Sequence, residues 1–136
     1  MAAITGSCLC KSITYQLNDE FQMAVNCHCS LCKKITGGAF ESIALIAEDA
    51  LKFTSGEEQL TSYQISELAR KHFCRTCGTP LYNLHSGVSD KAIIHIGSLD
   101  DPNCVTPTVN IHAENMLPWV KAIGELQTFE RGFGEK

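Results

Sequence analysis

The sequence predicts a small, mainly β protein made of antiparallel strands, with helices limited to short turns. Short runs rich in β-branched and aromatic residues recur between turn signals, at the spacing typical of an antiparallel sheet. No apolar pattern of helical period continues long enough to form a long helix. The predicted strands cover residues 12–17, 40–47, 60–64, 71–73, 81–84, 91–96 and 108–112.

Turn signals and two short helical segments complete this outline. Gly37-Gly38 and Ser55-Gly56 are typical of the turns that separate the strands, and helical turns are expected near residues 30–35 and 47–51. No internal repeat or flexible linker divides the chain. Its 136 residues can bury roughly two-thirds of the surface of the unfolded chain. We therefore expect one domain over residues 1–136.

Charge and hydropathy exclude several classes of partner. The net charge is −4 and the basic residues are dispersed, which gives no electrostatic reason to bind nucleic acid or an anionic membrane. The longest apolar runs, near residues 43–47 and 92–96, are far too short to cross a bilayer. The first residues lack the basic start and apolar run of a signal peptide. We expect a cytoplasmic protein without nucleic-acid or membrane partners.

The cysteines carry the strongest functional signal. Seven of the eight fall into three tight clusters, and in a reducing compartment such clusters are more often metal ligands or redox groups than disulfides. Zinc closes a structural site with four protein ligands and keeps one position open in a catalytic site that has three. Seven ligands therefore indicate two zinc ions per chain, one in a closed centre and one in an open centre. The clusters are Cys8-x-Cys10, Cys27-x-Cys29-x-x-Cys32 and Cys74-x-x-Cys77.

Two of the clusters can combine into the closed, structural centre. Residues two apart in an extended strand point to the same face, so Cys8 and Cys10 can present both sulfurs to one ion. The Cys74-x-x-Cys77 turn supplies the other pair, and Gly78 permits the positive φ needed to leave that turn. This centre would clamp the N-terminal segment to the middle of the chain.

The remaining cluster is the candidate catalytic centre. Cys27, Cys29 and Cys32 lie close enough in sequence for one loop to deliver all three thiolates to a single zinc ion. The fourth position would go to water, a neighbouring His or Asp, or a substrate atom. A rival assignment joins Cys29 and Cys32 with Cys74 and Cys77 in a zinc ribbon, but it wastes two well-spaced cysteines.

Other candidate residues have simpler interpretations. His28 lies between two proposed ligands on an extended segment, so it should point away from the metal, with a packing role or a role in supporting the ligands favoured over direct metal ligation. His85 and His95 alternate with apolar residues and are expected at a strand edge or in the core, while His72 fits either a core or a site role. Cys104 is expected to be an ordinary buried or loop cysteine.

An ordered set of motifs resembles the glutathione-dependent formaldehyde-activating enzyme family, which also includes centromere protein V. Together the motifs cover residues 6–119. They are Gly6-Ser7-Cys8-Leu9-Cys10, Cys27-His28-Cys29-Ser30-Leu31-Cys32, Thr36-Gly37-Gly38-Ala39-Phe40, Phe53-Thr54-Ser55-Gly56, Phe73-Cys74-Arg75-Thr76-Cys77-Gly78-Thr79-Pro80-Leu81, Gly97-Ser98-Leu99-Asp100-Asp101-Pro102 and Pro118-Trp119.

The resemblance implies a β-tent fold, a structural zinc and a catalytic zinc. It assigns the two cysteine pairs, Cys8/Cys10 and Cys74/Cys77, to the structural zinc ion. It assigns the triad Cys27, Cys29 and Cys32 to the catalytic zinc ion, in agreement with the spacing argument. The implied activity joins glutathione and formaldehyde into S-hydroxymethylglutathione, which is formally a carbon–sulfur lyase reaction in reverse. As a hypothesis, the incoming thiol occupies the fourth zinc position and attacks formaldehyde there, with zinc acting mainly as a template.

Some residues near the clusters bear on the substrate. Lys33, Lys34 or Arg75 could orient the carboxylates of glutathione. Two positions depart from the family pattern: Lys11 replaces a usual glycine, and Asn110 stands where a histidine is frequent. Neither change touches a metal ligand, but both could alter a substrate pocket.

Two alternatives to an enzyme remain open from the sequence. In a non-catalytic binding module, both zinc ions would stabilise the fold and neither would bind small thiols. The enzyme instead requires one zinc ion whose coordination changes when a thiol binds. A redox sensor would cycle low-pKa cysteines through disulfides, so zinc retention under mild oxidant would count against it.

Overall fold

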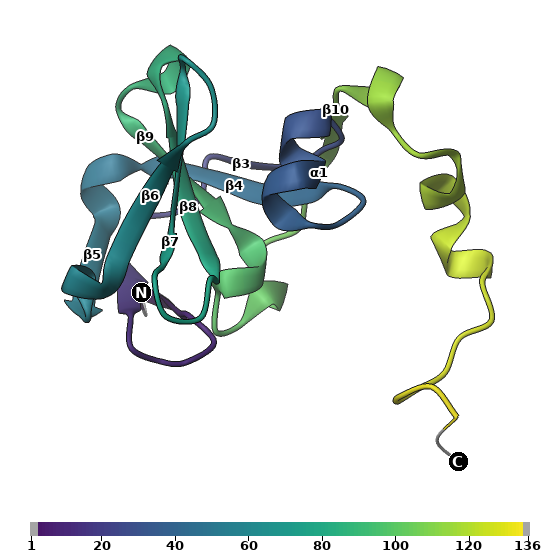
Figure 1. Cartoon of the computed structure of the whole chain (residues 1–136), viewed down its shortest axis with the longest axis horizontal. Helices are drawn as coiled ribbons and strands as arrows, with labels where there is room; N and C mark the ends of the chain where they lie inside the picture. The colour runs from purple at the N-terminus through teal and green to yellow at the C-terminus, as the bar shows by residue number, and fades with distance from the viewer. Residues whose placement is uncertain (1–2, 135–136) are drawn as a thin grey trace.

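The computed structural model describes residues 3–134, so the two outermost residues at each end of the predicted 1–136 domain lie outside it. Ten strands in this range form two sheets, and the predicted mainly β class is confirmed (Figure 1). The strands are β1 (Ile4–Ser7), β2 (Thr14–Leu17), β3 (Met23–Cys27), β4 (Glu41–Ala47), β5 (Leu51–Ser55), β6 (Leu60–Gln64), β7 (Ala69–Cys74), β8 (Pro80–His85), β9 (Lys91–His95) and β10 (Val109–Ile111).

The smaller sheet has the order β1-β2-β5, and the larger has the order β10-β3-β4-β9-β8-β7-β6. Neighbouring strands pair antiparallel, with the exception that β10 runs parallel to β3. All seven predicted strands are present, with ends shifted by at most two residues. The sequence patterns missed β1, β3 and β5, which are short and depend on their partner strands for stability.

Both predicted helical turns are present, the first as an α-helix and the second as a short 3-10 turn. Helix α1 (Ser30–Thr36) matches the predicted turn at 30–35, and it ends at Gly37, whose φ of 73° suits a glycine. Residues 47–51 contain only a three-residue 3-10 turn, Glu48–Ala50, and Leu51 already begins β5. Pairing of β5 with β2 begins at Leu51, directly after this turn.

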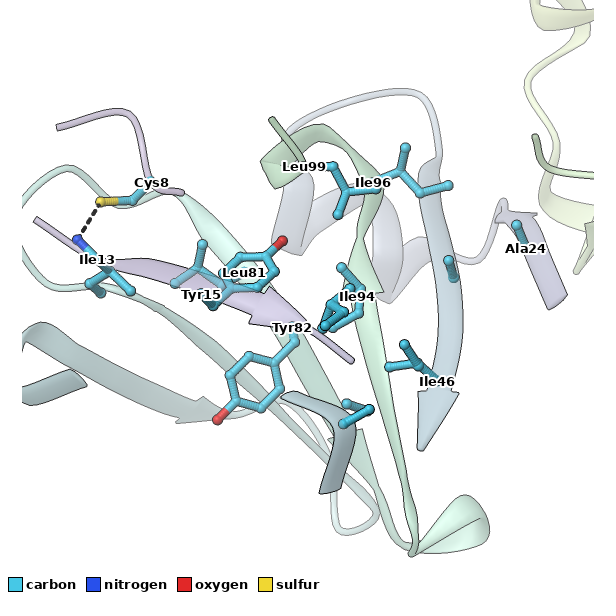
Figure 2. Close-up of a cluster of buried hydrophobic side chains, with 14 of the residues drawn as sticks. Cys8, Ile13, Tyr15, Ala24, Ile46, Leu81, Tyr82, Ile94, Ile96 and Leu99 are labelled. Atoms are coloured by element: carbon cyan, nitrogen blue, oxygen red, sulfur yellow. Dashed lines mark hydrogen bonds between the residues drawn. The ribbon is translucent and has the colours of Figure 1, made fainter. Parts of the chain in front are cut away.

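The hydrophobic core lies between the two sheets. It joins Ile13, Tyr15 and Leu17 from the smaller sheet region to residues such as Leu81 and Ile94 of the larger sheet (Figure 2). The Tyr15 hydroxyl lies 2.6 Å from Ser98 Oγ, and burial raises the pKa of Tyr15 to about 12. The core thus holds β2 firmly against the strands that carry the cysteine turn at 74–77.

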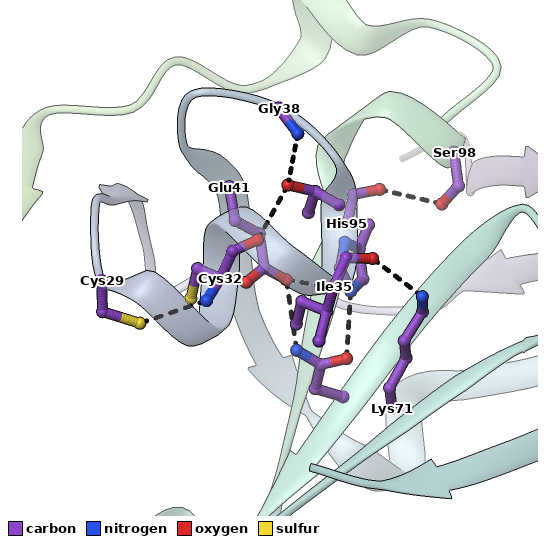
Figure 3. Close-up of polar contacts among 10 residues, drawn as sticks. Cys29, Cys32, Ile35, Gly38, Glu41, Lys71, His95 and Ser98 are labelled. Carbon is purple, nitrogen blue, oxygen red and sulfur yellow. Dashed lines mark hydrogen bonds and ion pairs between the residues drawn. The ribbon is translucent and has the colours of Figure 1, made fainter. Parts of the chain in front are cut away.

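The opposite face of the larger sheet carries different chemistry. Because side chains alternate along a strand, Ile43 and Leu45 point away from the core to which Ala44 and Ile46 contribute. At one end of this second face lie Glu41 and His95, next to α1 (Figure 3). The candidate catalytic cysteines belong to this end.

After β10 the chain leaves both sheets. Residues 113–134 form the 3-10 segments Ala113–Asn115 and Pro118–Glu125 and then an irregular end, and they extend away from the rest of the protein (Figure 1). No residue from 106 to 134 is buried. Within residues 3–134, no helix has the length and apolar character needed to cross a membrane.

Candidate metal centres

Four cysteines from distant parts of the chain form the first group, which we call the quartet: Cys8, Cys10, Cys74 and Cys77. Their sulfur atoms all lie within 4.8 Å of one another. The Sγ of Cys10 is 3.6 Å from that of Cys8 and 3.8 Å from that of Cys74. A tetrahedral zinc ion with Zn–S bonds of about 2.3 Å separates its sulfur ligands by about 3.8 Å. The quartet therefore has the geometry to hold one four-coordinate metal ion.

Backbone and hydroxyl donors surround these sulfurs. The Sγ of Cys8 accepts from the backbone N–H of Ile13 at 3.3 Å, and the Sγ of Cys74 accepts from that of Thr76 at 3.3 Å. A hydrogen bond from the Thr79 hydroxyl, 3.2 Å away, is the main cause that lowers the pKa of Cys77 to about 5. Since the thiolate is the metal-binding form of cysteine, the donors around Cys74 and Cys77, whose pKa values are lowered, favour metal binding, while the pKa of Cys10 is raised.

The second group, which we call the trio, comes from one short segment. The sulfurs of Cys27, Cys29 and Cys32 lie within 4.8 Å of one another. Cys27 ends β3, and Cys29 caps α1, where its Sγ accepts from the backbone N–H of Cys32 at 3.3 Å. In residues 3–134, no further Cys, His, Asp or Glu ligand atom joins this group.

The two groups separate the cysteines as the spacing argument predicts. Cys29 and Cys32 cluster with Cys27, whereas Cys74 and Cys77 cluster with the N-terminal pair, so the zinc-ribbon arrangement is not formed. Cys104 is exposed and belongs to neither group, so it does not complete the trio and is not buried.

A buried polar cluster that the sequence patterns missed lies beside the trio. Glu41 stands opposite Cys27 in the register of β3 and β4, and only 1% of it is exposed. Its Oε1 lies 3.0 Å from His95 Nε2 and accepts from Asn83 Nδ2 at 3.1 Å (Figure 3). The sequence held one signal for this cluster. Side chains alternate along β4 and β9, and this alternation places the Glu41 carboxylate on the same face of the sheet as His95.

Electrostatics make this corner a place for a cation. Burial acts to raise the pKa of Glu41, but the hydrogen bond and charge of His95 hold it below the usual value, helped by Cys32 and Asn83. Burial and the nearby Glu41 carboxylate raise the pKa of the Cys32 thiol. Ionising Cys32 next to a buried carboxylate is unfavourable unless positive charge is close, and a divalent metal ion supplies it.

The packing role predicted for His28 agrees with its contacts. It is 1% exposed, its Nε2 lies 3.0 Å from Asn110 Oδ1, and its ring centroid is 5.1 Å from that of Phe40. Asn110, one of the two departures from the family pattern, thus supports the residue between two cysteines of the trio. Its effect on the site passes through His28.

The other histidines belong to neither sulfur group. His72 stacks on Tyr82 with ring centroids 4.4 Å apart, and burial lowers its pKa. His85 Nδ1 accepts from the backbone N–H of Gly87 at 2.9 Å. Both are packing or turn residues in this fold.

Comparisons with known proteins place the chain in a family. The family model described as "Glutathione-dependent formaldehyde-activating enzyme" matches residues 3–115. The chain belongs to this family. A "putative glutathione-dependent formaldehyde-activating enzyme" of Halomonas elongata is 25% identical over 87% of this chain and 80% of the relative. A similarly named protein of Podospora anserina is 31% identical over 57% of this chain, which spans 38% of that relative.

Two further matches extend the comparison. An uncharacterized lyase of Schizosaccharomyces pombe is 30% identical over 60% of this chain and 58% of the relative. A crystal structure of a Rhodobacter sphaeroides protein shares the fold, with a TM-score of 0.63 and 24% identity over 78% of this chain and 98% of that one. The predicted membership in the formaldehyde-activating family and the β fold are thus confirmed.

Lys11, where the resemblance leads us to expect glycine, has a backbone conformation that suits glycine. Its φ is 66°, in the left-handed region that costs a residue with a Cβ about 1–2 kcal/mol. The side chain compensates in part, since Nζ donates to Ser7 Oγ at 3.0 Å, and Ser7 donates to Asp100 at 2.7 Å. Lys11 therefore changes the turn at the quartet and lies outside the trio.

The three basic candidates for substrate carboxylates divide between the two groups. Lys33 and Lys34 lie on α1 with the trio, and the Lys33 ammonium donates to the backbone carbonyl of Asn115. Arg75 is exposed beside the quartet, with Nη2 3.5 Å from the carbonyl of Leu60. Of the three, the two lysines are the ones placed next to the open centre.

Proposed function

We propose that this protein is a zinc-dependent enzyme that adds a thiol to formaldehyde, with glutathione as the thiol, and that it acts in the cytoplasm. The reaction is that of a carbon–sulfur lyase in the bond-forming direction. The single observation that carries the proposal is the contrast between the two sulfur groups, of which the quartet can saturate a tetrahedral ion and the trio leaves one position open.

In this proposal each group holds one zinc ion, two per chain. The quartet acts structurally, because it ties the N-terminal turn to the turn after β7. The trio acts catalytically. Zinc bound there supplies charge that favours the thiolate form of an incoming thiol, and a free coordination position for its sulfur.

The reaction itself is a simple addition. The thiol loses its proton, its sulfur forms a bond to the carbonyl carbon, the π bond of the carbonyl breaks, and the oxygen gains a proton. No electron is transferred to or from another molecule. The chain contributes by placing the sulfurs of the trio and by holding Glu41 rigidly behind them through His95 and Asn83. Lys34 and Lys33 offer positive charge to the glutathione carboxylates.

The test compares two cysteine variants in the purified full chain. Zinc content is measured, and hydroxymethyl adduct formation from glutathione and ¹³C-formaldehyde is followed by NMR. The wild type should contain two zinc ions per chain and accelerate the reaction. Cys29→Ser should lose one zinc ion and the catalysis while keeping its far-UV circular dichroism. Cys104→Ser, a cysteine outside both groups, should behave as wild type.

Substitution with cobalt separates the enzyme from the binding module. Glutathione should change the absorption bands of one cobalt ion per chain and leave the other unchanged, because only the trio has a free position. Unchanged turnover in Cys29→Ser, or two metal ions that both ignore glutathione, would rule out the proposed role of the trio.

A further inference from the structure

Most of the segment that follows β10 extends away from the sheets of its own chain (Figure 1). We call residues 112–134 the tail. Five of its large apolar side chains are exposed, with exposed fractions from 43% to 95%. They are Trp119, Ile123, Leu126, Phe129 and Phe133. A stretch of this length that shows so many apolar side chains to water is typical of a segment that is covered by a partner.

The direction of the tail is fixed where it begins. His112 has a φ of 57° and a ψ of 45°, a left-handed conformation that turns the chain sharply after β10. Its Nδ1 lies 3.5 Å from Glu114 Oε1, and the Lys33 ammonium on α1 donates to the Asn115 carbonyl. The ion pair lies within the tail, and the Lys33 hydrogen bond holds the start of the tail to α1, while the rest extends away from the sheets (Figure 1).

The larger sheet has an apolar face that is only partly covered. We call it the outer face. The strand register places its residues side by side across β10, β3, β4 and β9, on the side away from the core. Met23, Val109 and Ile111 are exposed by 48%, 43% and 36%, and only Val25 in this set is buried. The outer face consists of Met23, Val25, Ile43, Leu45, Ile93, Val109 and Ile111.

From these two surfaces we infer that the protein forms a two-fold dimer in which each tail covers the outer face of the other copy. The chain exposes apolar side chains both on its tail and on its outer face. A second copy can bury both surfaces at once, because its outer face receives the tail and its own tail covers the outer face. Because the exchange is reciprocal, the assembly closes at two copies. The face ends at Cys27, which pairs with Ile111 in the register, so the partner's tail would border the trio.

The area agrees with a stable dimer. If each of the five tail side chains buries roughly 100 Å² more, one tail hides about 500 Å² and covers a similar area of the sheet. Two exchanged tails then bury about 2,000 Å² in total, which is in the range of stable protein dimers. Charge does not oppose the contact: in residues 112–134, Lys121 and Arg131 nearly balance Glu114, Glu125 and Glu130.

The first test measures mass in solution by sedimentation velocity on the full, metal-loaded chain. We expect twice the chain mass of 14.9 kDa at micromolar concentration. The tail variant Trp119→Ser/Phe129→Ser and the face variant Leu45→Lys should each weaken association at least tenfold. Tyr63→Ser, which changes a side chain 65% exposed on β6, is the matched control and should stay dimeric. A monomeric wild type would overturn the inference.

The second test asks whether the tails are exchanged. The tail variant keeps an intact outer face, and the face variant keeps an intact tail. When the two are mixed, the tail of the face variant can cover the outer face of the tail variant, so a mixed dimer should form. A dimer that pairs face with face and tail with tail would show no such rescue, and that result would overturn the inference. The tail variant changes no buried residue, so loss of folding does not confuse this arm.

A photo-crosslinker at position 119 completes the test. Wild-type chains labelled with ¹⁵N are mixed with unlabelled chains that carry p-benzoylphenylalanine in place of Trp119. Crosslinks should join unlabelled chains to labelled peptides from residues 41–47. Crosslinks only within one chain would mean that the tail folds back on its own sheet, and would overturn the exchange.

Discussion

The quartet and the trio bring cysteines together in opposite ways. The quartet joins segments 64 residues apart in sequence, such as Cys10 and Cys74, and the sheets between them must form before the sulfurs can meet. The trio lies within one strand end and the first turn of a seven-residue helix. A metal ion at the quartet is therefore coupled to the whole fold, whereas one at the trio is coupled to a local turn. The trio is therefore the centre that can keep an open coordination position, because the fold as a whole does not depend on its metal ion.

The largest expected effect breaks the quartet. Cys74→Ser should lower the free energy of unfolding by on the order of 5 kcal/mol, because the binding energy of a structural metal ion is folding energy. Cys29→Ser should cost only about 1 kcal/mol, since its ion closes a local turn. Urea denaturation of the two variants, with Cys104→Ser as control, measures the difference. Equal losses for Cys74→Ser and Cys29→Ser would remove the distinction between the two groups.

The buried cluster behind the trio should give the next largest effect. Glu41→Ala leaves His95 and Asn83 buried without their carboxylate partner, and breaking a buried pair in this way costs about 3–5 kcal/mol. Glu41→Gln keeps an acceptor for the hydrogen bond and should cost less. Denaturation gives the stability, and zinc competition with a chelator shows which ion is weakened. We expect only the ion at the trio to be affected.

Acid should separate the two groups further. A lowered pKa keeps a thiolate deprotonated as pH falls, and the pKa of Cys77 is lowered to about 5 by the Thr79 hydroxyl. The pKa of Cys32 is raised by burial and by Glu41, so this ligand takes up a proton at higher pH. Neither group is uniform, because the pKa of Cys10 in the quartet is raised and that of Cys29 in the trio is lowered, where burial is outweighed by its hydrogen bonds. Since the trio also has one ligand fewer, the first zinc ion to leave on titration from about pH 8 downwards should be the one at the trio. Metal release measured in wild type and Cys29→Ser identifies the order, and release from the quartet first would contradict it.

The smallest effect concerns the turn of the quartet. Lys11→Gly relieves a left-handed residue but loses the hydrogen bond to Ser7, so we expect a gain of about 0.5–1 kcal/mol in stability. Lys34→Gly is the matched control, because Lys34 lies in helix α1, where glycine costs about 1 kcal/mol. Thermal denaturation should shift in opposite directions for the two variants. A loss of stability in Lys11→Gly would show that the Ser7 bond outweighs the strain.

Much of this protein could be predicted from local patterns. Period-two alternation found β2, β4 and the strands from β6 to β10, and the C-x-C and C-x-x-C spacings found the three cysteine clusters, because these patterns act between residues that are near neighbours. The cysteine count then joined the two distant pairs into the quartet. The helical turn predicted at 47–51 forms as a 3-10 turn over Glu48–Ala50, but β5 after it was missed, because pairing with β2 decides its conformation. Glu41 was missed for a similar reason: its partners His95 and Asn83 come from strands far away in sequence.

The sequence by itself determined the family, the mainly β class and the division of seven cysteines into a four and a three, since each follows from residue types at short spacing. Only the tertiary structure decided which charged group stands behind the trio, why Lys11 occupies a strained turn and where the tail points. Those features depend on strand register and on the φ angles of single residues, and long-range packing sets both.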